Sequence, residues 1–281
     1  MPETTDYVIE SSQLLALPEV YLRVKDALDD PDTGIDTVAK LISNDPAMTA
    51  RLLKVANSAI YGHVARIDNL TRAMTVMGTR ATHDIILATS LAHAFKGIYN
   101  VDYDLVCFWR KSLLRASVAQ ATAEALHLQD CARHFITGLL SDIGHMVMCV
   151  KEPQLMQRVL QQHEKTGHPL HLYERSTFGF DFGELGGDVL DSWSLPETIV
   201  TPVRYQNCPE LSPSLNIEAA IIYCSSRLHP DEDLFPSIID LKTLELCGIN
   251  RLDYDAVRGQ AEQLFEEVVA LFPLQQYKQA V

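Results

Sequence analysis

Apolar residues recur along this chain every three to four positions, and clusters of turn-forming residues separate the apolar runs. The stretch 35–42 is typical, because its isoleucine, valine and leucine residues fall on one helical face. Directly after it, Asp45 can accept hydrogen bonds from free N–H groups, and Pro46 suits the first helical position. Alternation of the kind found in strands is almost absent. The pattern therefore predicts an all-α fold.

The same periodicity, cut at the turn formers, predicts the individual elements. Helices are expected over about 14–28, 35–42, 46–56, 68–78, 80–95, 105–126, 131–149, 153–166, 181–193, 196–206, 216–228 and 253–272. We interpret residues 1–13 as a polar leader and 14–228 as one domain, with an N-terminal helical lobe (14–98) and a second lobe (99–228). Residues 229–281 then form an acidic, helical C-terminal extension.

Charge and cysteine usage narrow the classes of function. The formal net charge is −14, from 23 basic and 37 acidic residues, and the basic residues are dispersed, so the field does not favour nucleic acid as a partner. None of the six cysteines forms a CxxC pair. The N-terminus lacks the basic and apolar regions of a signal peptide, and no apolar stretch approaches the roughly 20 residues that span a bilayer. We expect a cytoplasmic protein without membrane insertion.

Two segments carry a resemblance to a known family. Residues 42–59, ISNDPAMTARLLKVANSA, resemble the N-terminal signature of HDOD domains, which are helical output modules of bacterial signalling proteins. Residues 137–145, TGLLSDIGH, are similar to the GLLHDIGK stretch of the wider HD superfamily. The likeness covers roughly residues 14–210, in the correct order, and implies an HDOD/HD-like helical bundle.

HD hydrolases hold a divalent metal ion with a histidine, a His-Asp pair and a late aspartate. The resemblance implies which residues of this chain match those ligands. Here the first histidine is matched by Lys111, the pair by Ser141-Asp142 and the aspartate by Ser226. Further histidines of some relatives would fall at Phe182 and within Gln206-Asn207, where none is present.

A metal ion is not expected at these positions. An ammonium group has no lone pair, and hydroxyl groups are weak ligands. We hypothesise that Lys111 pairs with Asp142 and so fills the metal position. The alternative is that Lys111 lies on the surface and Asp142 only caps a helix or bonds to backbone. His145 takes the place of a lysine in related enzymes, and could face the old site or be an ordinary surface histidine.

Other groups of histidine, serine and glycine residues do not predict an enzyme. The histidines at 163, 168 and 171 straddle a Gly-Pro break and do not share a helix face. Ser141, Asp142 and His145 lack the nucleophile elbow and oxyanion loop of a hydrolytic triad. The glycines at 183, 186 and 187 suit close helix packing better than a phosphate loop.

The function that the resemblance implies is a non-catalytic regulatory module in signal transduction. It would act through contacts with separate signalling proteins and would need no cofactor. The degenerate cleft is a second candidate binding site, for a small ligand or a nucleotide. One alternative is a metal-dependent HD-type phosphohydrolase acting on nucleotides or cyclic dinucleotides. A second alternative is a nucleotide-binding receptor without turnover, in which Lys111 contacts phosphate.

Overall fold

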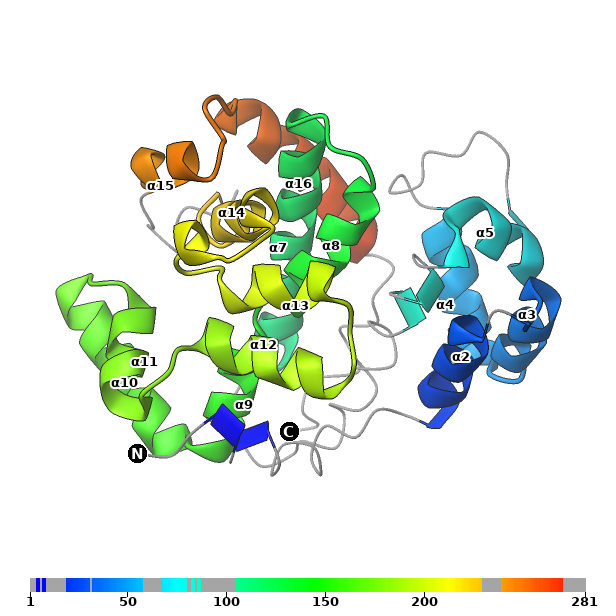
Figure 1. Ribbon diagram of the computed structural model, residues 1–281, viewed down its shortest axis with the longest axis horizontal. Helices are drawn as coiled ribbons and strands as arrows, with labels where there is room; N and C mark the ends of the chain where they lie inside the picture. Colours follow the sequence, from blue (N-terminus) through cyan, green and yellow to red (C-terminus); the bar gives the residue numbers. More distant parts are fainter. Residues whose placement is uncertain are drawn as a thin grey trace. The chain divides into compact units, whose positions relative to one another are not determined.

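The computed structural model describes residues 4–5, 7–8, 19–30, 32–57, 67–79, 82–83, 85–86, 105–228 and 239–269. The chain divides into two compact units, one of residues 1–14 with 98–262 and one of residues 15–97 with 263–281. Every regular element in the described ranges is helical, so the all-α prediction is confirmed (Figure 1). The lobe boundaries inferred from the sequence stay predictions.

Each of the two units is built from helices. The larger unit contains α7 (Leu105–Ala125), α8 (Cys131–Leu140), α9 (Ile143–Lys151), α10 (Pro153–Thr166), α11 (Leu170–Phe178), α12 (Phe182–Ser192), α13 (Glu197–Arg204), η3 (Pro209–Leu211), α14 (Asn216–Ser225), α15 (Leu241–Leu246) and the start of α16 (Tyr254–Val269). The smaller unit contains α2 (Glu19–Asp29), α3 (Ile35–Ser43), α4 (Pro46–Ala56) and α5 (Leu70–Met77).

Helix α7 is the centre of the larger unit. Its residues 112–123 are all buried, and several of them are alanine or serine, so neighbouring helices can approach on every side. Helices α8 and α14 pack directly on α7, while α13 bridges α12, α8 and α14 (Figure 1). Part of this core is a cluster in which Ala119 and Ala123 meet Ile221 and Ile222.

The sequence pattern predicts one helix over 131–149, but the structure has two. Helix α8 ends at Leu140 and α9 begins at Ile143, with Ser141 and Asp142 between them. The hydroxyl group of Ser141 donates to the carbonyl oxygen of Gly138 (2.8 Å) and so stabilises the end of α8. Periodicity does not reveal this break, because apolar residues continue on both sides of it.

In the smaller unit, the HDOD-like signature includes α4 and the residues on either side of this helix. Asp45 accepts a hydrogen bond from the backbone N–H of Met48 (3.0 Å) at the start of α4, as its position before Pro46 predicts. At the other end, the amide of Asn57 donates to the Ile67 carbonyl (2.7 Å) and accepts from the Ile67 N–H (2.8 Å). Two side chains of the signature, one at each end of α4, therefore satisfy backbone groups.

Two helices were not anticipated, and one expected helix is largely outside the described residues. The structure has α11 between the predicted stop at residues 166–169 and α12, and α15 in a segment that we expected to be irregular. Both are short. Of the helix expected over 80–95, only four residues are described.

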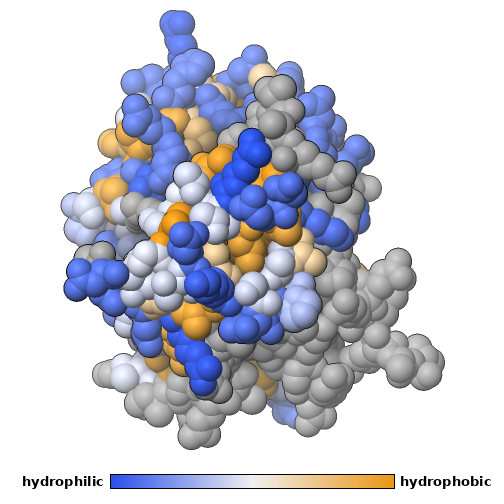
Figure 2. All heavy atoms as spheres, turned by 90° about the vertical axis from the view of Figure 1, so that its right-hand side faces the viewer, coloured by the Kyte–Doolittle hydropathy of each residue, from blue (hydrophilic) through white to orange (hydrophobic). Residues whose placement is uncertain are grey.

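Side chains on the surface are mixed in character. On the face shown in Figure 2, apolar patches are interrupted by hydrophilic residues, which is ordinary because folded chains lack enough polar groups to cover themselves. Among the described helices, none combines the length and apolar character needed to cross a bilayer.

Candidate functional site

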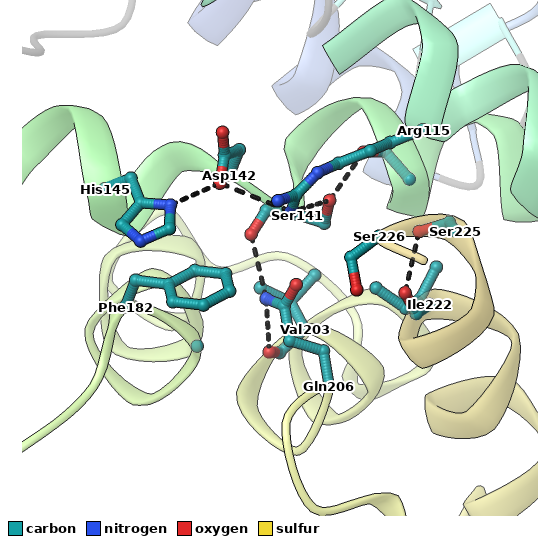
Figure 3. A network of polar contacts seen from close by, with 12 residues as sticks. Arg115, Ser141, Asp142, His145, Phe182, Val203, Gln206, Ile222, Ser225 and Ser226 are labelled. Carbon is teal, nitrogen blue, oxygen red and sulfur yellow. Dashed lines mark hydrogen bonds and ion pairs between the residues drawn. The ribbon is translucent and has the colours of Figure 1, made fainter. Parts of the chain in front are cut away.

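Close contact between α7 and α8 brings together residues that the resemblance predicted at an HD-type site. A Cβ added to Gly138 would lie 2.8 Å from the carbonyl oxygen of Arg115, so glycine allows the two backbones to meet there. Ser141 and Asp142 follow at the end of α8, and Figure 3 shows both beside the Arg115 side chain. The crossing therefore brings a cationic side chain of α7 to the Ser-Asp pair.

Arg115 and Asp142 form a buried ion pair. Nη1 of Arg115 lies 3.2 Å from Oδ1 of Asp142, and the two side chains are 6% and 7% exposed. Burial alone would raise the pKa of Asp142, but the charges of Arg115 and His145, with a smaller contribution from Lys111, hold that pKa well below its usual range. Asp142 is therefore a carboxylate at neutral pH.

His145 joins two carboxylates. Its Nδ1 lies 2.6 Å from Oδ1 of Asp142, and its Nε2 lies 2.7 Å from Oε1 of Glu174. Burial would lower the pKa of His145, but Glu174 and Asp142 raise it to about 9. The imidazole is therefore protonated at neutral pH, and both of its nitrogens donate hydrogen bonds.

Glu174 connects this group to the start of α12. The residue is completely buried, and its Oε2 accepts a hydrogen bond from the backbone N–H of Phe182 (3.1 Å). A carboxylate at this end of a helix is stabilised by the helix dipole. The Phe182 ring stacks on His145, with centroids 3.8 Å apart and planes 16° apart. Four charged side chains from α7, α9, α11 and the α8–α9 junction thus form one network: Arg115, Asp142, His145 and Glu174.

Ser141 and Gln206 complete the inner side of this network. The hydroxyl group of Ser141 lies 3.4 Å from Nη1 of Arg115, and its carbonyl oxygen accepts a hydrogen bond from Nε2 of Gln206 (2.8 Å). Gln206, directly after α13, also donates to the carbonyl of Val203 (2.9 Å) (Figure 3). Phe182 and Gln206, which lie where the resemblance predicted histidines of some relatives (182 and within 206–207), thus both contact this network.

Three of the five residues expected at the site lie together, and two do not join them. Ser141, Asp142 and His145 contact one another or share Arg115. Ser226 instead donates to the carbonyl of Tyr223 (3.0 Å) and accepts from Arg227 (2.7 Å). Lys111 acts on Asp142 as a charge that lowers its pKa.

The hypothesis of an ion pair between Lys111 and Asp142 needs a correction. Within the described ranges, the ion pairs of Asp142 are made by Arg115 and His145. The reason is geometric: Arg115 lies one helical turn beyond Lys111, where Gly138 of α8 meets α7. Asp142 occupies the N-cap position of α9, as the alternative expected, but its side chain makes no capping hydrogen bond there.

The donor set does not fit a divalent metal ion. The guanidinium group and the imidazolium ring have no lone pair to offer a metal, and they surround the one carboxylate that matches the HD motif. A cation entering this position would meet two positive charges. In the part of the chain that the structure describes, no group of three metal-ligating side chains is free to hold an ion.

Sequence reasoning missed Arg115 and Glu174. The signal for Arg115 was a single charge in a run of alanine, serine and leucine residues on α7, where every neighbour is buried. Glu174 gave no comparable signal, because it stands next to another charged residue, Arg175, in a segment where no helix was expected.

Comparison with known proteins supports the family resemblance seen in the sequence. The sequence matches the HDOD domain family over residues 14–209, which is more than half of the chain. The chain belongs to the HDOD family. In this HDOD protein, residues 14–209 include both motif segments and every member of the charged network.

Solved structures share the fold. A protein described as "Putative phosphohydrolase" from Shewanella amazonensis SB2B is 22% identical, with a TM-score of 0.70 and 98% of each chain covered. An HDOD domain protein with unknown function from Geobacter sulfurreducens is 22% identical, with a TM-score of 0.67 and coverage of 94% and 92%. A "Putative signal transduction protein" from Marinobacter aquaeolei VT8 is 19% identical, with a TM-score of 0.68, and the match covers 94% of the present chain. At these identities the likeness shows the fold.

A curated relative is longer than this chain. An uncharacterized protein of Treponema pallidum (strain Nichols) is 24% identical over 195 residues, which is 68% of this chain. The match spans only 37% of the length of that relative.

Proposed function

We propose that this HDOD protein is a non-catalytic signalling module that acts through contacts with separate proteins. The observation that carries the proposal is the position of Arg115, whose guanidinium group lies 3.2 Å from the only motif carboxylate. In HD hydrolases this carboxylate serves a metal ion that activates water. Here a cation of the chain itself pairs with it, so a metal-bound hydroxide has no place to form.

The charged network suits a structural role. It contains two cations and two carboxylates, so its charges compensate, and each member is at least 87% buried. Buried charges are stable only when they are paired and hydrogen-bonded. A network that joins α7, α9, α11 and α12 fixes the bundle geometry that a binding partner would recognise.

Exposed apolar residues support protein contacts. Leu211 on η3 is 68% exposed, and Leu241 and Leu246 on α15 are 60% and 63% exposed. The two elements contact each other. Large apolar side chains gathered on neighbouring elements are typical of interaction surfaces.

Two measurements test the absence of catalysis. Purified protein is incubated with Mn²⁺, dialysed and analysed for bound metal, and is then assayed with nucleotides and cyclic dinucleotides. We expect substoichiometric metal and no hydrolysis above the protein-free rate. Stoichiometric metal together with hydrolysis that Asp142→Asn abolishes would contradict the proposal and favour the phosphohydrolase.

The protein-contact part has its own test. Tagged wild-type protein and the Leu241→Asp/Leu246→Asp variant are used to capture partners from the native host, with Leu172→Asp as the matched control on α11. Leu172 is 52% exposed and lies on neither η3 nor α15. We expect a protein that the wild type and Leu172→Asp retain and the double variant loses. Equal recovery with all three proteins contradicts a role for this surface.

A further inference from the structure

A pocket of about 540 Å³ lies where the end of α14 meets the start of α16. This volume is within the range of small-molecule sites in proteins. Its described lining consists of two arginines, two aspartates, a tyrosine and three aliphatic residues: Arg227, Leu228, Ile239, Leu252, Asp253, Tyr254, Asp255 and Arg258. All of these residues belong to the larger unit, and none of them belongs to the charged network around Asp142.

Arg227 is held rigidly in the wall of this pocket. Its guanidinium carbon lies 3.6 Å from the centre of the Tyr223 ring, and Nη1 donates to the Tyr223 carbonyl (3.0 Å) and to the Ser226 hydroxyl (2.7 Å). These contacts use one nitrogen of the guanidinium group. Nε and Nη2 make no hydrogen bond to any of the described residues.

The positive charge of Arg227 has no carboxylate partner among the described residues. By contrast, Arg115, Arg175 and Arg204 each pair with at least one described carboxylate. Burial lowers the pKa of Arg227, and the groups whose charges act on it are the Tyr223 phenol, two thiols and Arg115. A half-buried cation of this kind borders a cavity and has two nitrogens that no described residue engages, so it is suited to an anionic ligand.

The rest of the lining narrows the ligand class. Leu228, Ile239 and Leu252 provide an aliphatic wall, and Tyr254 provides an aromatic ring. The exposed carboxylates of Asp253 and Asp255 can accept hydrogen bonds, although one oxygen of Asp253 already accepts from Ala256 N–H (3.0 Å). A ligand that satisfies all three parts has a phosphate, a flat or apolar body, and hydroxyl or amino donors.

We propose that this pocket binds a nucleoside monophosphate, with the phosphate on Arg227, the base against Tyr254 and the aliphatic wall, and the ribose or base donors on the aspartates. Arginine suits phosphate because its planar guanidinium group can donate two parallel hydrogen bonds. Arg258 adds a second positive charge to the same wall.

The inference is independent of the proposed function. The pocket needs no metal ion and includes neither Lys111 nor Asp142. Binding is therefore measured in EDTA, so that metal-dependent chemistry at the HD-type position cannot contribute. A failure of this proposal leaves the argument from Arg115 and Asp142 unchanged.

The test is calorimetric titration of the full chain with AMP, GMP, CMP and UMP, with adenosine and inorganic phosphate as fragments. We expect at least one nucleotide to bind with a stoichiometry near one, more tightly than either fragment. Arg227→Gln should weaken that binding about tenfold or more, because it removes charged hydrogen bonds. Arg158→Gln, an exposed arginine on α10 outside the pocket, is the matched control and should bind as the wild type does.

A second variant covers the case in which Arg227→Gln does not fold. Leu252→Trp keeps Arg227 and fills the pocket, and it should abolish binding while the circular dichroism spectrum stays unchanged. The proposal is overturned if no nucleotide binds at millimolar concentration, if inorganic phosphate binds as tightly as the nucleotides, or if Leu252→Trp binds as tightly as the wild type.

Discussion

Arg115 and Asp142 form a buried ion pair at the crossing of α7 and α8, with 3.2 Å between Nη1 and Oδ1. By the resemblance to the HD motif, this carboxylate aligns with a metal ligand of HD hydrolases, and here a cation of the chain itself pairs with it. A metal ion offers open coordination positions for water, whereas a guanidinium group offers only N–H donors. The Arg115 guanidinium group therefore neutralises the carboxylate charge without offering a Lewis acid.

Removing Arg115 should be strongly destabilising. Arg115→Met leaves Asp142 buried beside a single remaining cation, and breaking a buried pair costs about 3–5 kcal/mol of unfolding free energy. Arg115→Met/Asp142→Asn should recover part of this loss, because the carboxylate charge is gone. Urea unfolding of the wild type, both single variants and the double variant measures the coupling. Lys111→Met is the control, with an expected cost below about 1 kcal/mol because its side chain is half-buried and is not the ion-pair partner. A larger loss for Lys111→Met than for Arg115→Met would contradict the assignment.

The raised pKa of His145 predicts a pH-dependent stability. The pKa is about 9 in the folded protein against 6.5 for the ordinary group, so the folded state binds the proton more tightly. The stabilisation is fully present below pH 6.5 and is lost as the pH rises through 9. Each pKa unit corresponds to about 1.36 kcal/mol, so the loss is on the order of 3 kcal/mol. Urea unfolding over this pH range should show the decline in the wild type.

His145→Gln separates this effect from other titrating groups. Burial raises the pKa values of the Cys149 and Cys224 thiols to about 12. Because these thiols ionise at a lower pH in the unfolded chain, they also reduce the stability at pH values above the ordinary pKa of a thiol. They are present in both proteins, so they cancel in the difference between wild type and variant. Parallel stability curves for the two proteins between pH 6.5 and 9 would show that His145 does not carry the effect.

The sequence predicted the helices more fully than the contacts between them. Periodicity and capping residues were sufficient for α3, α4, α10 and α12, because those signals are local. The break at Ser141 and the partner of Asp142 depend on how α8 crosses α7, which is a property of packing. The motif predicted Asp142 as a site residue, but not its partner. Arg115 rather than Lys111 forms the ion pair with it, and these two residues are one helical turn apart on α7.

Gly144 is predicted to tolerate no side chain. A Cβ there would lie 1.9 Å from the carbonyl oxygen of Phe182 and 2.8 Å from the backbone nitrogen of Gly186, both in α12. Because backbone atoms cannot rotate away, Gly144→Ala should cost about 3 kcal/mol or more. It should also separate the stacked rings of His145 and Phe182. Gly259→Ala in α16 is the control, since nothing lies within 4 Å of its added Cβ. That variant should be stabilised by about 0.5–1 kcal/mol, and thermal unfolding distinguishes the two.

Restoring the HD ligands should recover metal binding only when Arg115 is also removed. The hydroxyl of Ser141 lies 3.4 Å from Nη1 of Arg115, so a histidine placed at 141 would compete with the guanidinium group for the same space. Lys111→His/Ser141→His/Ser226→Asp alone should therefore bind substoichiometric Mn²⁺. Adding Arg115→Ala opens that space and frees the Asp142 carboxylate, and bound Mn²⁺ per chain should rise above that of the triple variant. Metal analysis after dialysis, with circular dichroism to check folding, measures both variants. Equal metal content in the two folded variants would mean that Arg115 does not exclude the ion, and the central argument for a non-catalytic site would fail.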